Sequence, residues 1–186
     1  MAANKKRAFD GLYAQLEEVN NHVVLFAAKG EPSVIFEMTN PVQQLCTDAE
    51  QYLRFQDVLS NIVQTLGEGY ALQKQDVFCK QSYHHEVPED AEFLTRSYFR
   101  YFEGREFTEI RTFLILTQEA QHSQFVQYDP KKWLDFHAKV NKVSDILSEK
   151  HIRHRMLSKE EVNEYCHRFM AFQFRHGPFS MTNFKA

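Results

Sequence analysis

The side chains that could bind a metal are spread along the chain. Its 186 residues include nine histidines and three cysteines, and the closest local group is Cys79 with His84 and His85. A structural zinc site takes four nitrogen or sulfur ligands, usually as two close pairs, so a second pair would have to come from Cys166 and His167. We therefore expect loop histidines and buried, reduced thiols, with no metal and no cofactor. The odd number of cysteines is typical of a cytoplasmic protein rather than of a disulfide framework.

Motifs for nucleotide or acyl-transfer chemistry are missing from the sequence. None of the six glycines belongs to a G-x-x-x-x-G-K-[ST] phosphate loop, and there is no G-x-S-x-G nucleophile motif. Gly67 and Gly69 follow a predicted helix and mark its end, whereas a phosphate-binding loop precedes a helix. We expect no catalytic residue and no enzymatic activity in this chain.

The densest basic run is KHIRHR, residues 150–155, in a chain whose net charge is −3. This run could contact an anionic lipid surface or nucleic acid. A short charged strand is, however, more typical of a sheet edge that is protected from pairing with other strands. Because a nucleic-acid-binding domain is usually basic as a whole, we expect no direct contact with nucleic acid.

The spacing of apolar residues predicts a series of strands and helices along the chain. The predicted elements are a hairpin over 22–38, a helix from Asn40 to the glycines at 67–69, a strand over 70–80, a helix over 91–103, a strand over 109–117, a helix from Asp129 to Leu147, a strand over 151–157 and a last helix after a capping box at 158–161. The strand over 109–117 is apolar on both faces in its second half, which is typical of a central strand.

This order predicts an α+β fold with an antiparallel sheet. Without the first strand and the 91–103 helix, the elements read β-α-β-β-α-β, the ferredoxin-like plan with helices on one face of the sheet. An extra N-terminal strand widens the sheet, the aromatic helix is an insertion, and the last helix is an appendage. We expect one domain over 1–178, with 179–186 as the start of a following subdomain.

The inserted helix over 91–103 has more aromatic residues than a core-facing stripe needs. At about 100° per residue, one arc of the helix forms the predicted core stripe. That stripe consists of Leu94, Tyr98, Tyr101 and Phe102. Phe93 and Phe99 lie outside it, one on each flank. Either the loops on both sides fold over them, or they are exposed and are our candidates for a docking surface.

Three segments carry a family resemblance: KQDVF at 74–78, FLTRSY at 93–98 and TFLILT at 112–117. They resemble the KQDWF-like strand, FLSRSF-like helix and CYLFLT-like strand in the N-terminal region of the TraG-type ATPases of Bacteroides-type conjugative transposons. Val77 stands where that family usually has Trp, so the resemblance is to a divergent member.

The resemblance implies a non-catalytic N-terminal interaction domain of a conjugative-transfer (type IV secretion) ATPase. Such a domain contacts other domains of the ATPase and channel subunits at the inner membrane, and the full-length enzyme is cytoplasmic and peripheral to that membrane. Its nucleotide site lies in a separate RecA-like domain. We expect no transmembrane segment, and a monomer or weak dimer for the isolated chain.

The alternative is a free-standing ferredoxin-like enzyme or ligand-binding regulatory domain. A reading frame that continues past Ala186 into a phosphate loop would favour the ATPase, because a free-standing protein should end after a folded element.

Overall fold

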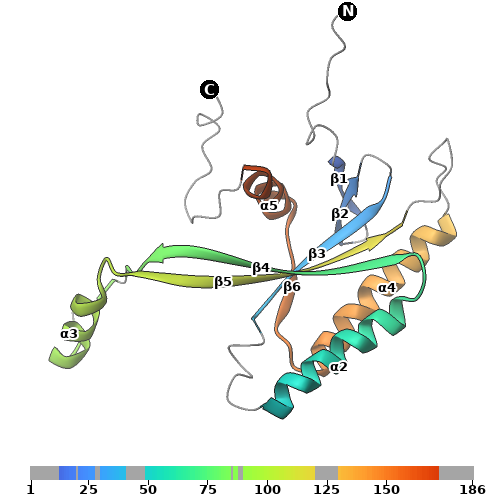
Figure 1. The fold of residues 1–186 in the computed structure, drawn as a ribbon. Coiled ribbons are helices and arrows are strands. Elements are labelled where there is room, and N and C mark those ends of the chain that lie inside the picture. The colour runs from blue at the N-terminus through green and yellow to red at the C-terminus, as the bar shows by residue number, and fades with distance from the viewer. Residues whose placement is uncertain are drawn as a thin grey trace, which may run out of the picture.

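The computed structural model describes residues 13–19, 21–27, 30–40, 49–84, 86–87, 90–119 and 130–171. Over these residues the chain is an α+β protein with a six-stranded antiparallel sheet and four helices (Figure 1). The elements are β1 (Tyr13–Val19), β2 (His22–Ala27), β3 (Pro32–Met38), α2 (Ala49–Leu66), β4 (Tyr70–Ser82), α3 (Phe93–Phe102), β5 (Glu106–Gln118), α4 (Pro130–Glu149), β6 (His154–Met156) and α5 (Lys159–Ala171). The predicted helix start at Asn40–Pro41, the cap at Asp129 and the segment 179–186 reach beyond the described residues.

The strand order in the sheet is β1-β2-β3-β5-β4, and β6 pairs with the end of β3. β5 lies between β3 and β4, which confirms the predicted central strand. The N-terminal addition differs from the prediction, because it contains two strands instead of one. β1 pairs with β2 through a tight turn in which Asn21 has a φ of 62°, a conformation that Asn tolerates better than most residues.

Helices α2 and α4 cover one face of the sheet (Figure 1). Their apolar residues recur at three- and four-residue spacing, as the sequence predicts for a buried helix face. The fully buried side chains of this layer include Phe36, Ile62, Leu114, Leu116, Phe136, Val140, Val143 and Leu147.

Helix α5, the last helix that the sequence predicts, covers the opposite face of the sheet. Val162 and Cys166 pack in a second buried cluster with residues of β2, β3, β4 and β5. The capping box predicted at the start of this helix is confirmed. The backbone N–H of Ser158 donates to the Glu161 carboxylate at 2.9 Å, and the N–H of Glu161 donates to Ser158 Oγ at 3.3 Å.

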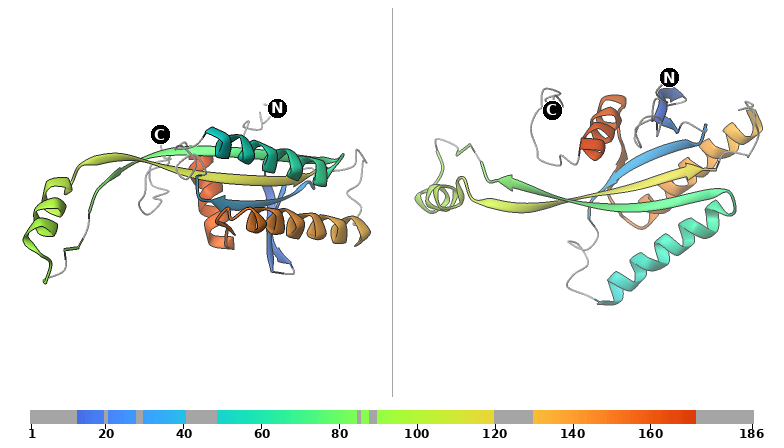
Figure 2. Two further views of the ribbon diagram at one scale, coloured as in Figure 1. Left: turned by 90° about the horizontal axis from the view of Figure 1, so that it is seen from below. Right: turned by 45° about the horizontal axis from the view of Figure 1, so that its top comes forward.

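Strands β4 and β5 form a ribbon that extends beyond the rest of the sheet. They pair over their full length, from Tyr70 with Gln118 to Ser82 with Glu106, while β3 pairs only with residues 112–117 of β5. The outer part of the ribbon therefore has no third strand beside it among the described residues. Figures 1 and 2 show α3 at the end of this ribbon, far from the other helices. We call the outer ribbon and α3 together the arm, residues 77–111.

Candidate functional site

The end of the arm is held together by backbone hydrogen bonds across the ribbon. The N–H of Tyr83 donates to the carbonyl of Arg105 at 2.9 Å, and the N–H of Gly104 donates to the carbonyl of Tyr83 at 2.8 Å. Gly104 has a φ of 72°, the left-handed conformation that commonly ends a helix and favours glycine. The chain thus leaves α3 and enters β5 within a few residues, as the sequence predicts for Gly104.

Tyr83 packs against α3 through two aromatic contacts. The ring of Phe99 stacks on it with centroids 6.5 Å apart and an interplanar angle of 13°, and the ring of Phe102 meets it edge-on at 6.2 Å. Phe99 and Phe102 are half-buried as a result. Of the two candidate docking residues, Phe99 is therefore partly covered by the arm itself.

The remaining large side chains of α3 are exposed, and no residue of this helix is buried. The exposed set consists of Phe93 at 80 %, Leu94 at 76 %, Tyr98 at 58 % and Tyr101 at 60 %. At 100° per residue these four fall within an arc of about 140°, and we call this surface the tip face. The predicted core stripe is therefore wrong: Leu94, Tyr98 and Tyr101 face solvent, because α3 lies beyond the sheet that would have covered them.

The ribbon behind α3 adds one exposed aromatic residue to each of its faces. Phe78, 65 % exposed, pairs with Ile110, and Phe107, 45 % exposed, pairs with Gln81. Side chains alternate between the faces of a strand, which puts Phe78 and Phe107 on opposite faces. Neither residue was singled out from the sequence, because exposure here depends on how far the ribbon extends beyond β3.

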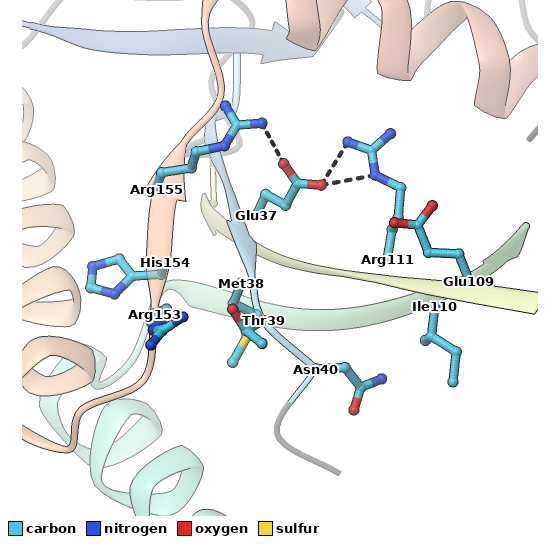
Figure 3. Close-up of a pocket in the computed structure, with 10 residues that line it drawn as sticks. All are labelled: Glu37, Met38, Thr39, Asn40, Glu109, Ile110, Arg111, Arg153, His154 and Arg155. Atoms are coloured by element: carbon cyan, nitrogen blue, oxygen red, sulfur yellow. Dashed lines mark hydrogen bonds and ion pairs between the residues drawn. The ribbon is translucent and has the colours of Figure 1, made fainter. Parts of the chain in front are cut away.

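An open cavity of about 420 Å³ lies where β3 ends between β5 and β6 (Figure 3). Glu37 lies between two arginines there. Its Oε1 accepts hydrogen bonds from Arg111 Nε at 2.8 Å and Nη2 at 2.6 Å, and its Oε2 accepts one from Arg155 Nη2 at 2.5 Å. The other side of the Arg155 guanidinium donates to Glu161 Oε2 at 2.7 Å.

These ion pairs account for part of the basic run at 150–155. The hydrogen bond with Glu161 raises the pKa of Arg155, and the same bond is the main reason that the pKa of Glu161 is lowered. Arg155 is on β6, which pairs with β3 over residues 36–38. The ion pairs of Glu37 hold the end of β3 to β5 and β6. Among the described residues the cavity offers carboxylate and guanidinium groups, but no paired nucleophile and base.

The cysteines and histidines considered for a metal are separated by the fold. Cys79 and Cys166 are buried in the cluster under α5, whereas His84 Nδ1 lies 2.6 Å from Glu103 Oε1 at the end of the arm. Burial raises the pKa of both thiols, and that of Cys166 reaches about 11, so they are poor nucleophiles. In the described part of the chain no three His, Cys, Asp or Glu residues are grouped to hold a metal ion. His85 lies outside the described residues.

A buried histidine pair joins the N-terminal hairpin to α4. His22 Nδ1 and His137 Nδ1 lie 2.5 Å apart, and the two rings stack with centroids 4.7 Å apart. His22 Nε2 lies 3.0 Å from Asn141 Oδ1, so it carries a proton and donates to that oxygen. His22 Nδ1 must then accept from His137 Nδ1–H, which leaves His137 Nε2 as an acceptor. This buried nitrogen has no hydrogen-bond partner among the residues that the structure describes.

Among the described helices, none is long and apolar enough to cross a membrane. Comparison with known proteins adds no assignment, since no family model and no curated protein matches the chain.

Because of the histidine pair, we expect the free energy of unfolding to fall in acid. Burial is the main reason, and the neighbouring His22 the second, that the pKa of His137 lies below its ordinary value of 6.5. The unfolded chain therefore takes up a proton near pH 6.5, and the folded chain only at lower pH. This contribution to stability is complete above pH 6.5 and is lost as the pH falls below it, by at most about 1.4 kcal/mol per pH unit for one proton.

The measurement is the free energy of urea unfolding between pH 8 and pH 5, for the parent and for His137→Phe. We expect a smaller decrease in the variant, whatever its stability at pH 8. Equal pH dependence in the two proteins would contradict the assignment to this pair.

Proposed function

We propose that this chain is a non-catalytic protein-interaction domain and that the tip face is its docking surface. The observation that carries the proposal is a ten-residue helix with no buried residue that presents large apolar side chains at the end of a projecting ribbon. A soluble domain exposes single apolar residues commonly, but a contiguous group usually marks an interaction site. Aromatic residues are also enriched among those that contribute most to binding energy.

The α+β fold is best interpreted as ferredoxin-like with additions. The order β6-β3-β5-β4, with α2 between β3 and β4 and α4 between β5 and β6, agrees with the split βαβ plan. On this interpretation the β1–β2 hairpin and α5 are additions, and α3 replaces the tight turn between the two middle strands.

The proposed assembly is a conjugative type IV secretion system, on the basis of the resemblance to TraG-type ATPases. The three segments that carry this resemblance lie in β4, α3 and β5, and thus in the arm and the strands that anchor it. In such an ATPase the arm would contact other domains of the enzyme or inner-membrane channel subunits during DNA transfer. The protein would then act on the cytoplasmic side of that membrane.

The alternative, a free-standing enzyme or ligand-binding regulatory domain, would use the cavity beside Glu37. We favour the interaction domain, because Arg111 and Arg155 are already bonded to that glutamate. An anionic ligand would have to compete with an existing carboxylate for both guanidinium groups.

The chain is expected to neither bind nor hydrolyse ATP, because its sequence lacks the glycine-rich loop and lysine that hold the phosphates. Calorimetric titration with Mg-ATP should give no saturable heat. A single tight site would show that the interaction domain has a nucleotide function of its own.

Phe93→Glu in the full-length protein should lower the frequency of conjugative transfer. A residue at the centre of an interface commonly contributes about 2 kcal/mol or more, so we expect a loss of at least about tenfold. The matched control is Leu134→Glu on α4, since Leu134 is 65 % exposed but lies away from the arm. Equal transfer by the two variants, with both proteins folded, would contradict the proposed role of the tip face.

A further inference from the structure

We propose that the tip face pairs with the tip face of a second copy of this chain, with the two α3 helices antiparallel about a two-fold axis at Ser97. This inference rests on the proposed docking role of the tip face and names its occupant. Two copies related by a two-fold axis use the same surface, so the surface must be complementary to itself. The shape and the charges of α3 both satisfy that requirement.

The shape of the helix provides a small residue between two large ones. Phe93, Ser97 and Tyr101 follow at four-residue steps and so form one column on the helix surface. All three are exposed. Small residues allow two helix backbones to approach closely, and here Ser97 is the midpoint. In an antiparallel pair centred on it, Ser97 of one copy meets Ser97 of the other, and Phe93 of one lies beside Tyr101 of the other. The backbones can then approach at the centre while the rings pack side by side at both ends.

The charges of α3 favour the antiparallel direction. Its first end carries the exposed acids Asp90 and Glu92, and its last end carries the exposed bases Arg100 and Arg105. Antiparallel pairing brings the acidic end of each copy to the basic end of the other, whereas parallel pairing would place like charges together. The two helix dipoles also oppose each other in the antiparallel arrangement.

Some charged side chains at the last end of α3 already have partners within the same copy, and the antiparallel pairing does not require these contacts to break. Glu103 is bonded to His84, and the Arg105 guanidinium lies 3.6 Å from the centre of the Tyr101 ring. Arg105 thus covers one end of the tip face with a positive charge. Asp90 and Glu92 of the second copy would come to this end.

The size of the helix limits how tight the dimer is. Ten residues make a helix about 15 Å long, so the pair buries less than the roughly 1,200 Å² that stable complexes usually bury. The dimer should therefore be weak and depend on concentration. A ribbon that holds the tip away from the body keeps the two bodies from colliding when the tips meet.

Sedimentation equilibrium of the 186-residue chain tests self-association. We expect the average mass to rise from monomer toward dimer with concentration. Leu94→Glu should raise the dissociation constant at least tenfold, while Leu134→Glu on α4 should leave it unchanged. Glu92→Arg should weaken the dimer, and adding Arg100→Glu to that variant should restore it, because the exchange preserves opposite charges in the antiparallel pair.

Disulfide trapping tests the position of the two-fold axis. Ser97→Cys and Thr95→Cys are made in a Cys46→Ser background, since Cys79 and Cys166 are buried. Both positions are exposed on α3 but lie about 160° apart around the helix. Under mild oxidation Ser97→Cys should give a covalent dimer rapidly, and Thr95→Cys should not.

A chain that stays monomeric at every concentration, or equal trapping at the two positions, would overturn the inference. A monomeric chain combined with loss of transfer by Phe93→Glu would overturn the second copy as occupant and leave the proposed docking function standing. A dimer that breaks with Leu94→Glu, without any loss of transfer by Phe93→Glu, would support the second copy and contradict the proposed function.

Discussion

The hydrogen-bonded ladder between β4 and β5 is the constraint on which the rest of the structure depends. It continues through Ser82 and Glu106, whereas β3 leaves β5 at Thr112. Helix α5 still covers Val77 and Cys79 just beyond β3. Farther out, two strands alone cannot bury a side chain on either face, so the end of the ribbon and the helix there stay exposed. The arm is thus a direct result of one hairpin being longer than its neighbours, and the exposed aromatic residues follow from that difference.

The body of the protein is stable enough to hold such an arm because both faces of its sheet are covered. α2 and α4 close one face and α5 closes the other, so β5 is buried on both sides at its inner end. The inner end of the ribbon, with Val77 and Cys79, is therefore anchored in a core that does not include α3. The N-terminal hairpin is held to the same core by His22 and His137, which couples that addition to pH.

The sequence predicts the elements whose signals are local. The apolar stripe of α4, the capping box of α5 and the glycine that ends α3 each follow from residues a few positions apart, and all are present. β1 was missed because YAQLEEV shows no clean alternation of apolar and polar residues. The contact between His22 and His137 joins residues 115 positions apart, so no local pattern could reveal it.

The candidate site shows the limit of local patterns most clearly. Helical periodicity correctly groups Leu94, Tyr98 and Tyr101 on one side of α3, but periodicity alone does not say whether that side meets a core or solvent. The answer depends on how far β4 and β5 extend beyond β3, which is a property of strand pairing. Periodicity likewise left open whether Phe99 is exposed or covered by a flanking loop, and the structure covers it in part with Tyr83, in the loop before the helix.

The most direct test is to remove residues 83–105 and join Ser82 to Glu106 through Asn-Gly, a two-residue turn that suits a hairpin. If α3 is a docking element and no part of the core, the shortened chain should unfold cooperatively, with a free energy within about 0.5 kcal/mol of the parent, the range of changes at ordinary surface positions. A loss of about 3 kcal/mol or more, or loss of cooperative unfolding, would place α3 in the core of the fold and contradict its role as a docking element.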